Sequence, residues 1–100
     1  MSPRRDWNVY MIRCTDGSLY TGIATDVQRR FREHRSGGVR AAKYFRGHHP
    51  EGIVFSRKVG SRRSALMVEA KIKKASKQVK EALIADPPLI DPWMPTGCKG

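Results

Sequence analysis

The chain has 100 residues and a formal net charge of +11 at pH 7, from 20 Lys and Arg against 9 Asp and Glu. A chain of this length buries the core of one domain and leaves no room for a second one. The charge excess favours a polyanionic partner, most commonly nucleic acid, and the alternative is a protein that is merely basic.

Several features that would indicate other classes of protein are missing from the sequence. The start, "MSPRRDWNVY", has no apolar run typical of a signal peptide, and no stretch approaches the length of a membrane span. Cys14 and Cys98 are too few for a disulfide framework, which favours free thiols in a reducing compartment. His48 and His49 lack cysteine or acidic partners at zinc-ligand spacing, so we expect them in a solvated loop. We therefore expect a cytoplasmic protein without membrane contact.

The first half of the chain predicts a hairpin followed by a helix. "WNVYMIRC" is apolar at nearly every position, which is typical of a central strand. "TDGS" predicts a turn because Asp-Gly is a strong hairpin signal, and "LYTGI" is the returning strand. "TDVQRRFREH" predicts a helix, with Thr25 and Gln28 as a capping box and Asp26 at the positive end of the helix dipole. "SGG" ends this helix.

The second half predicts one more strand and two helices. Residues 39–50 form a basic loop with one helical turn around "AAKYF", and "GIVFSRKV" is the third strand. Residues 61–75 form a helix whose core-facing positions are Ala65, Val68, Ile72 and Ala75. Ser76 caps a third helix, "KQVKEALIA". The order β-β-α-β-α-α is that of an α+β domain, with a small three-stranded antiparallel sheet and helices packed against it.

We place the domain at residues 1–86. The tail at 87–100 is rich in proline, which breaks regular structure, and we expect it to be mobile. As an alternative for part of this tail, Leu89, Ile90 and Trp93 could pack back on the domain.

Tyr10 and Tyr20 stand on either side of the predicted turn, and the length of the loop decides whether they meet. A two-residue loop puts the two side chains on opposite faces of the sheet, because faces alternate along a strand. A three-residue loop at 15–17, with Gly17 in the left-handed region, puts Tyr10 opposite Gly22 and turns both rings to one face. The sequence permits either loop. Only the second makes a site, and it would leave open space at Gly22 beside both rings.

Two charged side chains could join such a site. Val27 and Phe31 form the expected buried stripe of the first helix, and Arg30 and His34 flank it one turn apart. Arg30 is thus the arginine that the core could hold while it reaches a cleft, and the alternative is that both flanking residues are solvated. Three residues are expected to point away from the stripe: Arg29, Arg32 and Glu33.

Glu69 is the only acid in the long basic stretch "SRRSALMVEAKIKKASKQVK". One interpretation is an i,i+4 salt bridge to Lys73, which stabilises a helix by about 0.3–0.5 kcal/mol. The other is a single carboxylate that holds a hard divalent cation near a phosphate.

Two hairpin tyrosines, a glycine, a helix arginine and one later glutamate together resemble the GIY-YIG nuclease superfamily, in particular its small stand-alone bacterial members. The resemblance covers roughly residues 6–85, in the right element order. The two motifs fall on residues 8–10 and 20–22, with Asn8 in place of the first glycine and Thr21 in place of isoleucine. The other matched residues are Arg30, His34 and Glu69.

The resemblance implies hydrolysis of phosphodiester bonds, with DNA as the expected substrate and repair or recombination as the expected process. It implies one Mg²⁺ or Mn²⁺ ion held by Glu69, with Arg30 stabilising the phosphate and Tyr10, Tyr20 or His34 as the base. We expect a monomer or weak dimer. The alternative function is a non-catalytic basic module that binds nucleic acid. The expected contacts to the nucleic-acid backbone are Arg29, Arg32, Arg35, Arg40, Lys43 and Arg46.

Overall fold

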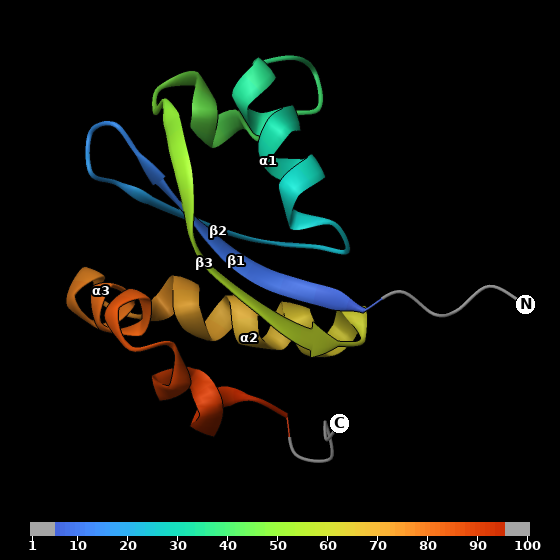
Figure 1. The fold of residues 1–100 in the computed structure, drawn as a ribbon, viewed down its shortest axis with the longest axis vertical. Helices are drawn as coiled ribbons and strands as arrows, with labels where there is room; N and C mark the ends of the chain where they lie inside the picture. The colour runs from blue at the N-terminus through green and yellow to red at the C-terminus, as the bar shows by residue number, and fades with distance from the viewer. Residues whose placement is uncertain (1–5, 96–100) are drawn as a thin grey trace, which may run out of the picture.

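The computed structural model describes residues 6–95 (Figure 1). Its elements in chain order are β1 (Trp7–Cys14), β2 (Leu19–Ala24), α1 (Val27–Ser36), η1 (Lys43–Arg46, 3₁₀), β3 (Pro50–Gly60), α2 (Arg62–Lys74), α3 (Lys77–Ala85) and η2 (Pro87–Trp93, 3₁₀). The strands form one antiparallel sheet in the order β2-β1-β3. The predicted α+β class and element order are confirmed. No helix among the described residues is long and apolar enough to cross a membrane.

Helices cover both faces of the sheet, with α1 on one side and α2 and α3 on the other (Figure 1). Side chains alternate between the two layers along β1. Val9 and Met11 pack in the core that contains Ile72 of α2, whereas Tyr10 and Ile12 pack in the core on the α1 side. β1 is therefore buried on both faces, which confirms its prediction as the central strand.

The ends of the helices follow local capping chemistry, with one difference from the prediction. Asp26, not Thr25, caps α1: its side chain accepts a hydrogen bond of 3.0 Å from the backbone N–H of Arg29. Aspartate is as good an N-cap as threonine, and its charge also suits this end of the helix dipole. α1 ends at Gly37 with φ 73°, the left-handed conformation predicted for the glycine pair. Ser76 caps α3 as predicted.

α2 presents the predicted residues to the core, because Ala65, Val68 and Ile72 are all buried. Ala75 is half-buried just beyond the end of this helix. The 3.6-residue periodicity of apolar side chains was therefore sufficient to find the buried face of α2.

The C-terminal segment η2 packs against the domain. Ile90 has none of its surface exposed and belongs to the core on the α2 side, and Trp93 packs against that core. Leu89 is half exposed. The packed structure thus continues past residue 86, as the alternative for Ile90 and Trp93 anticipated. The mobility of the tail stays a prediction, and its last five residues, which include Cys98, lie outside the described residues.

Thr21 offers a direct test of the packing between β2 and α2. Its hydroxyl is the one buried side-chain polar atom in residues 6–95 without a hydrogen-bond partner. Valine has the same shape without the hydroxyl, so we expect Thr21→Val to raise the free energy of unfolding by about 1 kcal/mol in chemical denaturation. Thr21→Ser is the control: it keeps the hydroxyl and loses a methyl group, so it should lower stability. A loss of stability in Thr21→Val would mean that the hydroxyl has a partner.

Candidate active site

The hairpin adopts the longer of the two predicted loops. Gly17 has φ 86°, and the N–H of Cys14 donates to the carbonyl of Ser18 at 2.9 Å. Tyr10 lies opposite Gly22, and the rings of Tyr10 and Tyr20 share one face, with centroids 6.3 Å apart. The three-residue loop and the shared face are therefore confirmed.

The turn of the hairpin is fastened to α3. The guanidinium of Arg13 forms a two-pronged ion pair with Glu81, with Nη2 and Oε1 2.7 Å apart. Lys77 donates from Nζ to the carbonyl of Gly17 at 2.8 Å. Charged groups from a separate helix thus hold the loop whose geometry sets the register of both tyrosines.

The space at Gly22 is filled, contrary to the prediction of open space. A Cβ atom at Gly22 would lie 2.6 Å from the hydroxyl oxygen of Tyr10 and 3.0 Å from Cε2 of Tyr20. The prediction was wrong because it placed the Tyr10 ring beside the glycine, whereas the phenol lies over the bare backbone. Glycine at this position allows the two rings to approach each other.

His34 is buried beneath Tyr10, with 1% of its surface exposed. Its Nε2 lies 3.0 Å from the hydroxyl of Tyr10, and its Nδ1 accepts a hydrogen bond of 3.2 Å from the backbone N–H of Ala42. An amide N–H can only donate, so Nδ1 carries no proton and Nε2 carries the single proton of the neutral ring. His34 therefore donates to Tyr10. A solvated position for His34, the alternative from the helix pattern, is excluded.

The protonation of His34 follows from the same geometry. Burial and the nearby charge of Arg30 lower the pKa of His34 to about 4, so the ring is neutral near pH 7. Both of its nitrogens are engaged, and no lone pair faces the solvent. His34 is thus unsuited to take a proton from an attacking water, and it is well placed to orient Tyr10.

The two tyrosines differ in exposure and in their charged neighbours. Burial raises the pKa of both phenols, and Tyr10 is 1% exposed whereas Tyr20 is half-buried. Lys73 and Arg30 lower the pKa of Tyr20, and so does a hydrogen bond from Tyr10. Tyr20 is therefore the easier of the two phenols to deprotonate and the easier for water to reach.

Arg30 is held in place by an acid that was predicted to point away. Its Nη1 lies 2.9 Å from Oε1 of Glu33 and donates to the carbonyl of Arg40 at 2.6 Å. Glu33 is half-buried and also lies 3.6 Å from Arg29. The prediction for Glu33 was wrong because the helix pattern counts apolar burial alone, whereas this carboxylate turns toward the arginines around it. A hollow of about 270 Å³ opens beside Arg30 and Glu33.

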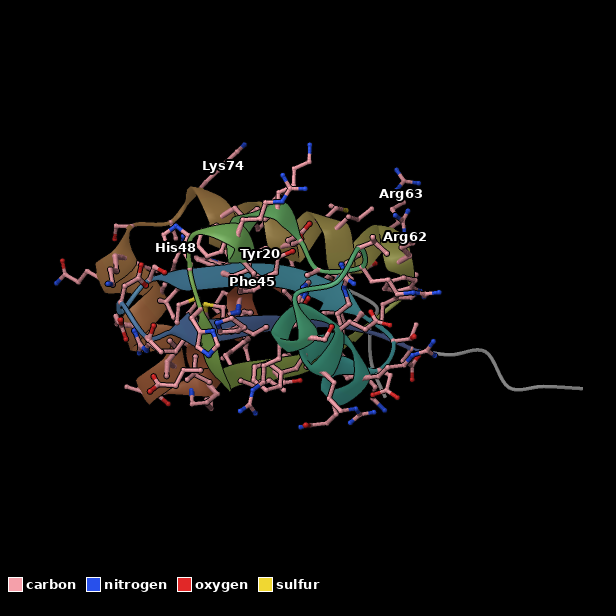
Figure 2. All side chains as sticks on the ribbon, turned by 90° about the horizontal axis from the view of Figure 1, so that it is seen from above. Tyr20, Phe45, His48, Arg62, Arg63 and Lys74 are labelled. Carbon is pink, nitrogen blue, oxygen red and sulfur yellow. The ribbon has the colours of Figure 1, made fainter. Side chains whose placement is uncertain are left out.

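Glu69 approaches the tyrosines from α2, which lies along the β2 side of the sheet (Figure 2). Burial is the main cause that raises the pKa of Tyr10 and Tyr20, and the negative charge of Glu69 adds to that rise, as a carboxylate near the two phenols would. Its side chain is 15% exposed, and Oε2 lies 3.4 Å from Nζ of Lys73. The salt bridge and the position beside the tyrosines thus exist together, and they do not exclude each other.

The donor set suits a magnesium ion that takes most of its ligands from outside the protein. Residues 6–95 contain no group of three or more His, Cys, Asp or Glu side chains that could hold a metal. A dedicated protein cage is therefore not available in this part of the chain. Mg²⁺ commonly uses one or two carboxylates together with waters and substrate phosphates, and the half-buried carboxylate of Glu69 fits that pattern.

Aromatic residues of η1 complete the site, and sequence reasoning missed them. The ring centroid of Phe45 lies 4.7 Å from that of Tyr20 and 4.5 Å from that of His34. Tyr44 lies 5.5 Å from Tyr20 and stacks on His48. His48 lies in the loop before β3 as predicted, with 36% of its side chain exposed, but its pairing with Asp16 was not predicted, and His49 is exposed as predicted. The "AAKYF" turn was predicted, but the direction of its rings depends on distant contacts.

The six predicted backbone-contact residues are all exposed around α1 and η1. Arg29 and Arg40 lie within 4.0 Å of Glu33, which offsets part of their charge. Further basic side chains, which the prediction omitted, project outward from α2 on the β2 side (Figure 2). They are Arg62, Arg63 and Lys74.

The buried neutral state of His34 predicts a dependence of stability on pH. An unfolded histidine titrates near pH 6.5, whereas folded His34 titrates near 4. Between these values the unfolded chain binds more protons, so the stabilisation is complete above pH 6.5 and is lost as the pH falls toward 4. We expect this loss to reach about 3 kcal/mol at most.

His34→Gln tests this expectation, because an amide can accept from Ala42 and donate to Tyr10 without titrating. The measurement is the free energy of unfolding from pH 7 to 4 for both proteins, and the wild type should fall more steeply. His49→Gln controls for the loss of an exposed histidine. Parallel curves for wild type and His34→Gln would contradict the assignment of a neutral buried ring.

The chain is similar to known proteins over most of its length. A family profile described as the GIY-YIG catalytic domain matches residues 6–82. The UPF0213 protein of Cronobacter sakazakii is 49% identical over 80 residues, which are 80% of this chain and 82% of that protein. The UPF0213 protein YhbQ of Escherichia coli K12 is 46% identical over 80 residues, which are 80% and 78% of the two chains. The solution NMR structure of the UPF0213 protein BH0048 from Bacillus halodurans is similar with a TM-score of 0.51 and 40% identity, covering 80% of this chain and 83% of the other.

Proposed function

This protein belongs to the GIY-YIG superfamily, and we propose that it is a metal-dependent endonuclease that hydrolyses phosphodiester bonds of DNA. The observation that carries the proposal is the convergence of two tyrosines, one arginine and one glutamate at the β2 edge of the sheet. We extend the proposal to repair or recombination as the process, because the superfamily is one of nucleases.

In this proposal Glu69 holds one Mg²⁺ or Mn²⁺ ion, which when bound supplies Lewis-acid stabilisation of charge on the leaving oxygen. Arg30 donates to the non-bridging oxygens of the phosphate and favours the more negative transition state. Glu33 fixes the guanidinium of Arg30 at 2.9 Å, so little side-chain freedom is lost when the phosphate binds. Lys73 lies beside the carboxylate of Glu69 and adds positive charge to the same edge.

We propose Tyr20 as the group that accepts the proton of the attacking water. His34 donates to the hydroxyl of Tyr10 at 3.0 Å, so the proton of that hydroxyl is free to point to Tyr20. Burial raises the pKa of Tyr20 on balance, and Lys73, Arg30 and the hydrogen bond from Tyr10 offset part of that rise. Tyr10 then acts as a donor that stabilises the phenolate of Tyr20, and His34 as the residue that orients Tyr10.

The test is a nicking assay on purified protein with duplex, branched and single-stranded DNA and with RNA of matched sequence. Cleavage should need Mg²⁺ or Mn²⁺ and should stop with a chelator. Tyr20→Phe should bind DNA as the wild type does and lose most of the cleavage, because phenylalanine keeps the ring and removes the proton acceptor. Intact binding without cleavage of any substrate by the wild type would favour a non-catalytic module. The salt bridge between Glu69 and Lys73 supports this second function, because it gives the carboxylate a structural role that needs no metal.

Nucleic-acid binding should be largely electrostatic and therefore sensitive to salt. Affinity should fall linearly on a logarithmic plot against salt concentration, because each phosphate neutralised releases a counterion. Arg32 and Arg46 are exposed and have no ion-pair partner within residues 6–95, so alanine at either position should reduce the slope by about 1. Arg57→Ala is the control, because Arg57 pairs with Asp91 of η2 in the other layer. A flat response to salt in the wild type would indicate another kind of partner.

A further inference from the structure

A short series of aromatic rings leads from Tyr20 toward the surface of the molecule. The ring centroids of Tyr20 and Tyr44 are 5.5 Å apart. The rings of Tyr44 and His48 are 4.2 Å apart and nearly parallel, with an interplanar angle of 13°. Figure 2 shows Tyr20 of β2 close to Phe45 of η1 and to His48 of the loop that follows η1. The proposed cleavage chemistry uses Tyr20 but neither Tyr44 nor His48.

The outermost ring, that of His48, is fixed in orientation. Its Nδ1 lies 2.7 Å from Oδ2 of Asp16 and 3.2 Å from the hydroxyl of Ser18. The same carboxylate accepts from the hydroxyl of Ser18 at 2.6 Å. These partners belong to the hairpin turn, which Lys77 holds against α3. The side chain of His48 is nevertheless 36% exposed, so part of this preformed ring faces solvent.

We propose that the Tyr44–His48 pair is a stacking platform for an unpaired base of the nucleic acid, next to the phosphodiester that is cleaved. The proposal rests on the proposed function, because it places the base relative to Tyr20. Ring-on-base stacking works for every base, since each has an aromatic face. Two basic residues of η1, Lys43 and Arg46, flank Tyr44 and are exposed, so they can hold the adjoining phosphates.

The platform predicts the class of substrate. In a continuous duplex, neighbouring base pairs cover both faces of each base, so no base can reach a protein ring without leaving the stack. A single strand, a flap or a frayed end presents free bases at no such cost. The protein should therefore prefer single-stranded segments. If the two rings only order the loop before β3, the duplex, whose charge density is higher, should bind at least as tightly as the single strand.

The experiment measures binding in a chelator, so that it does not depend on cleavage. The probes are a short single-stranded DNA carrying 2-aminopurine, whose fluorescence is quenched by stacking, and the duplex of the same sequence. His48→Asn removes the ring and keeps a donor toward Asp16, and Tyr44→Phe keeps the ring as a matched control. Circular dichroism checks that each variant is folded. Tyr44→Leu is a second variant that removes an aromatic face and keeps apolar packing against Phe45.

We expect the wild type to bind the single strand more tightly than the duplex and to quench its fluorescence. His48→Asn should weaken single-strand binding roughly tenfold, about 1.4 kcal/mol, and should restore fluorescence, with duplex binding unchanged. Tyr44→Leu should do the same, and Tyr44→Phe should behave as the wild type. Equal wild-type affinity for the two probes, or equal losses on both in His48→Asn, would overturn the platform.

Cleavage of the same probes with Mg²⁺ separates this proposal from the proposed function. Cleavage without preference for unpaired strands would leave the nuclease standing and overturn the platform. Selective single-strand binding without cleavage would support the platform and overturn the nuclease.

Discussion

Replacing Glu69 by glutamine should lower the rate of phosphodiester cleavage by at least about a hundredfold, comparable to the loss of one strong transition-state interaction of about 2.7 kcal/mol. Glutamine has nearly the same volume and helix propensity, so α2 should form as before. A neutral amide is a poor ligand for Mg²⁺, which prefers carboxylate and water oxygens. The change also frees Lys73, now 3.4 Å from the carboxylate, so nucleic-acid binding should stay the same or become slightly tighter.

The measurement is a single-turnover nicking rate beside a binding isotherm. Glu51→Gln is the matched control, because it makes the same change of charge at an exposed position of β3. Equal rates in wild type and Glu69→Gln would mean that Glu69 acts only through its salt bridge to Lys73. Such a pair stabilises a helix by about 0.3–0.5 kcal/mol.

The parts of the fold that local chemistry determines could be predicted from the sequence. The Asp16-Gly17 pair and the left-handed preference of glycine were enough to propose the loop that sets the register of Tyr10 and Gly22. The apolar periodicity of α2 placed its buried face, and Ser76 marked the start of α3. In each case the determining atoms lie within a few residues of one another.

The features that sequence reasoning missed depend on partners far apart in the chain. Glu33 turns inward because three arginines surround it, and one of them, Arg40, lies beyond the end of α1. His48 is ordered by Asp16, 32 residues away. The tautomer of His34 is set by a backbone N–H in the loop that follows its helix. No pattern of spacing identifies such contacts before the fold brings the segments together.

Because the space at Gly22 is filled, Gly22→Ala should lower both stability and cleavage. The new methyl carbon would lie 2.6 Å from the hydroxyl oxygen and 2.8 Å from Cζ of Tyr10. Tyr10 has little room to shift, because the residue is 1% exposed and its hydroxyl is hydrogen-bonded to His34 at 3.0 Å. One of the two rings must therefore shift, and the overpacking should lower the free energy of unfolding by about 1–3 kcal/mol.

Cleavage by Gly22→Ala should fall about a hundredfold, because displacing a reacting group by about 1 Å has effects of that size. The nicking rate and the free energy of unfolding are measured beside those of Gly52→Ala, where a new methyl group meets no atom within 4 Å. Both changes place alanine in a strand, so Gly52→Ala controls for the change of residue type. It should keep full activity and stability, because its methyl group meets open space. The double variant Gly22→Ala with Tyr10→Phe removes the closest clash, so it should recover part of the stability while cleavage stays low. If Gly22→Ala were as stable and as active as the wild type, the close packing of the two tyrosines over Gly22 would not be needed for the chemistry, and the proposed donor role of Tyr10 toward Tyr20 would be wrong.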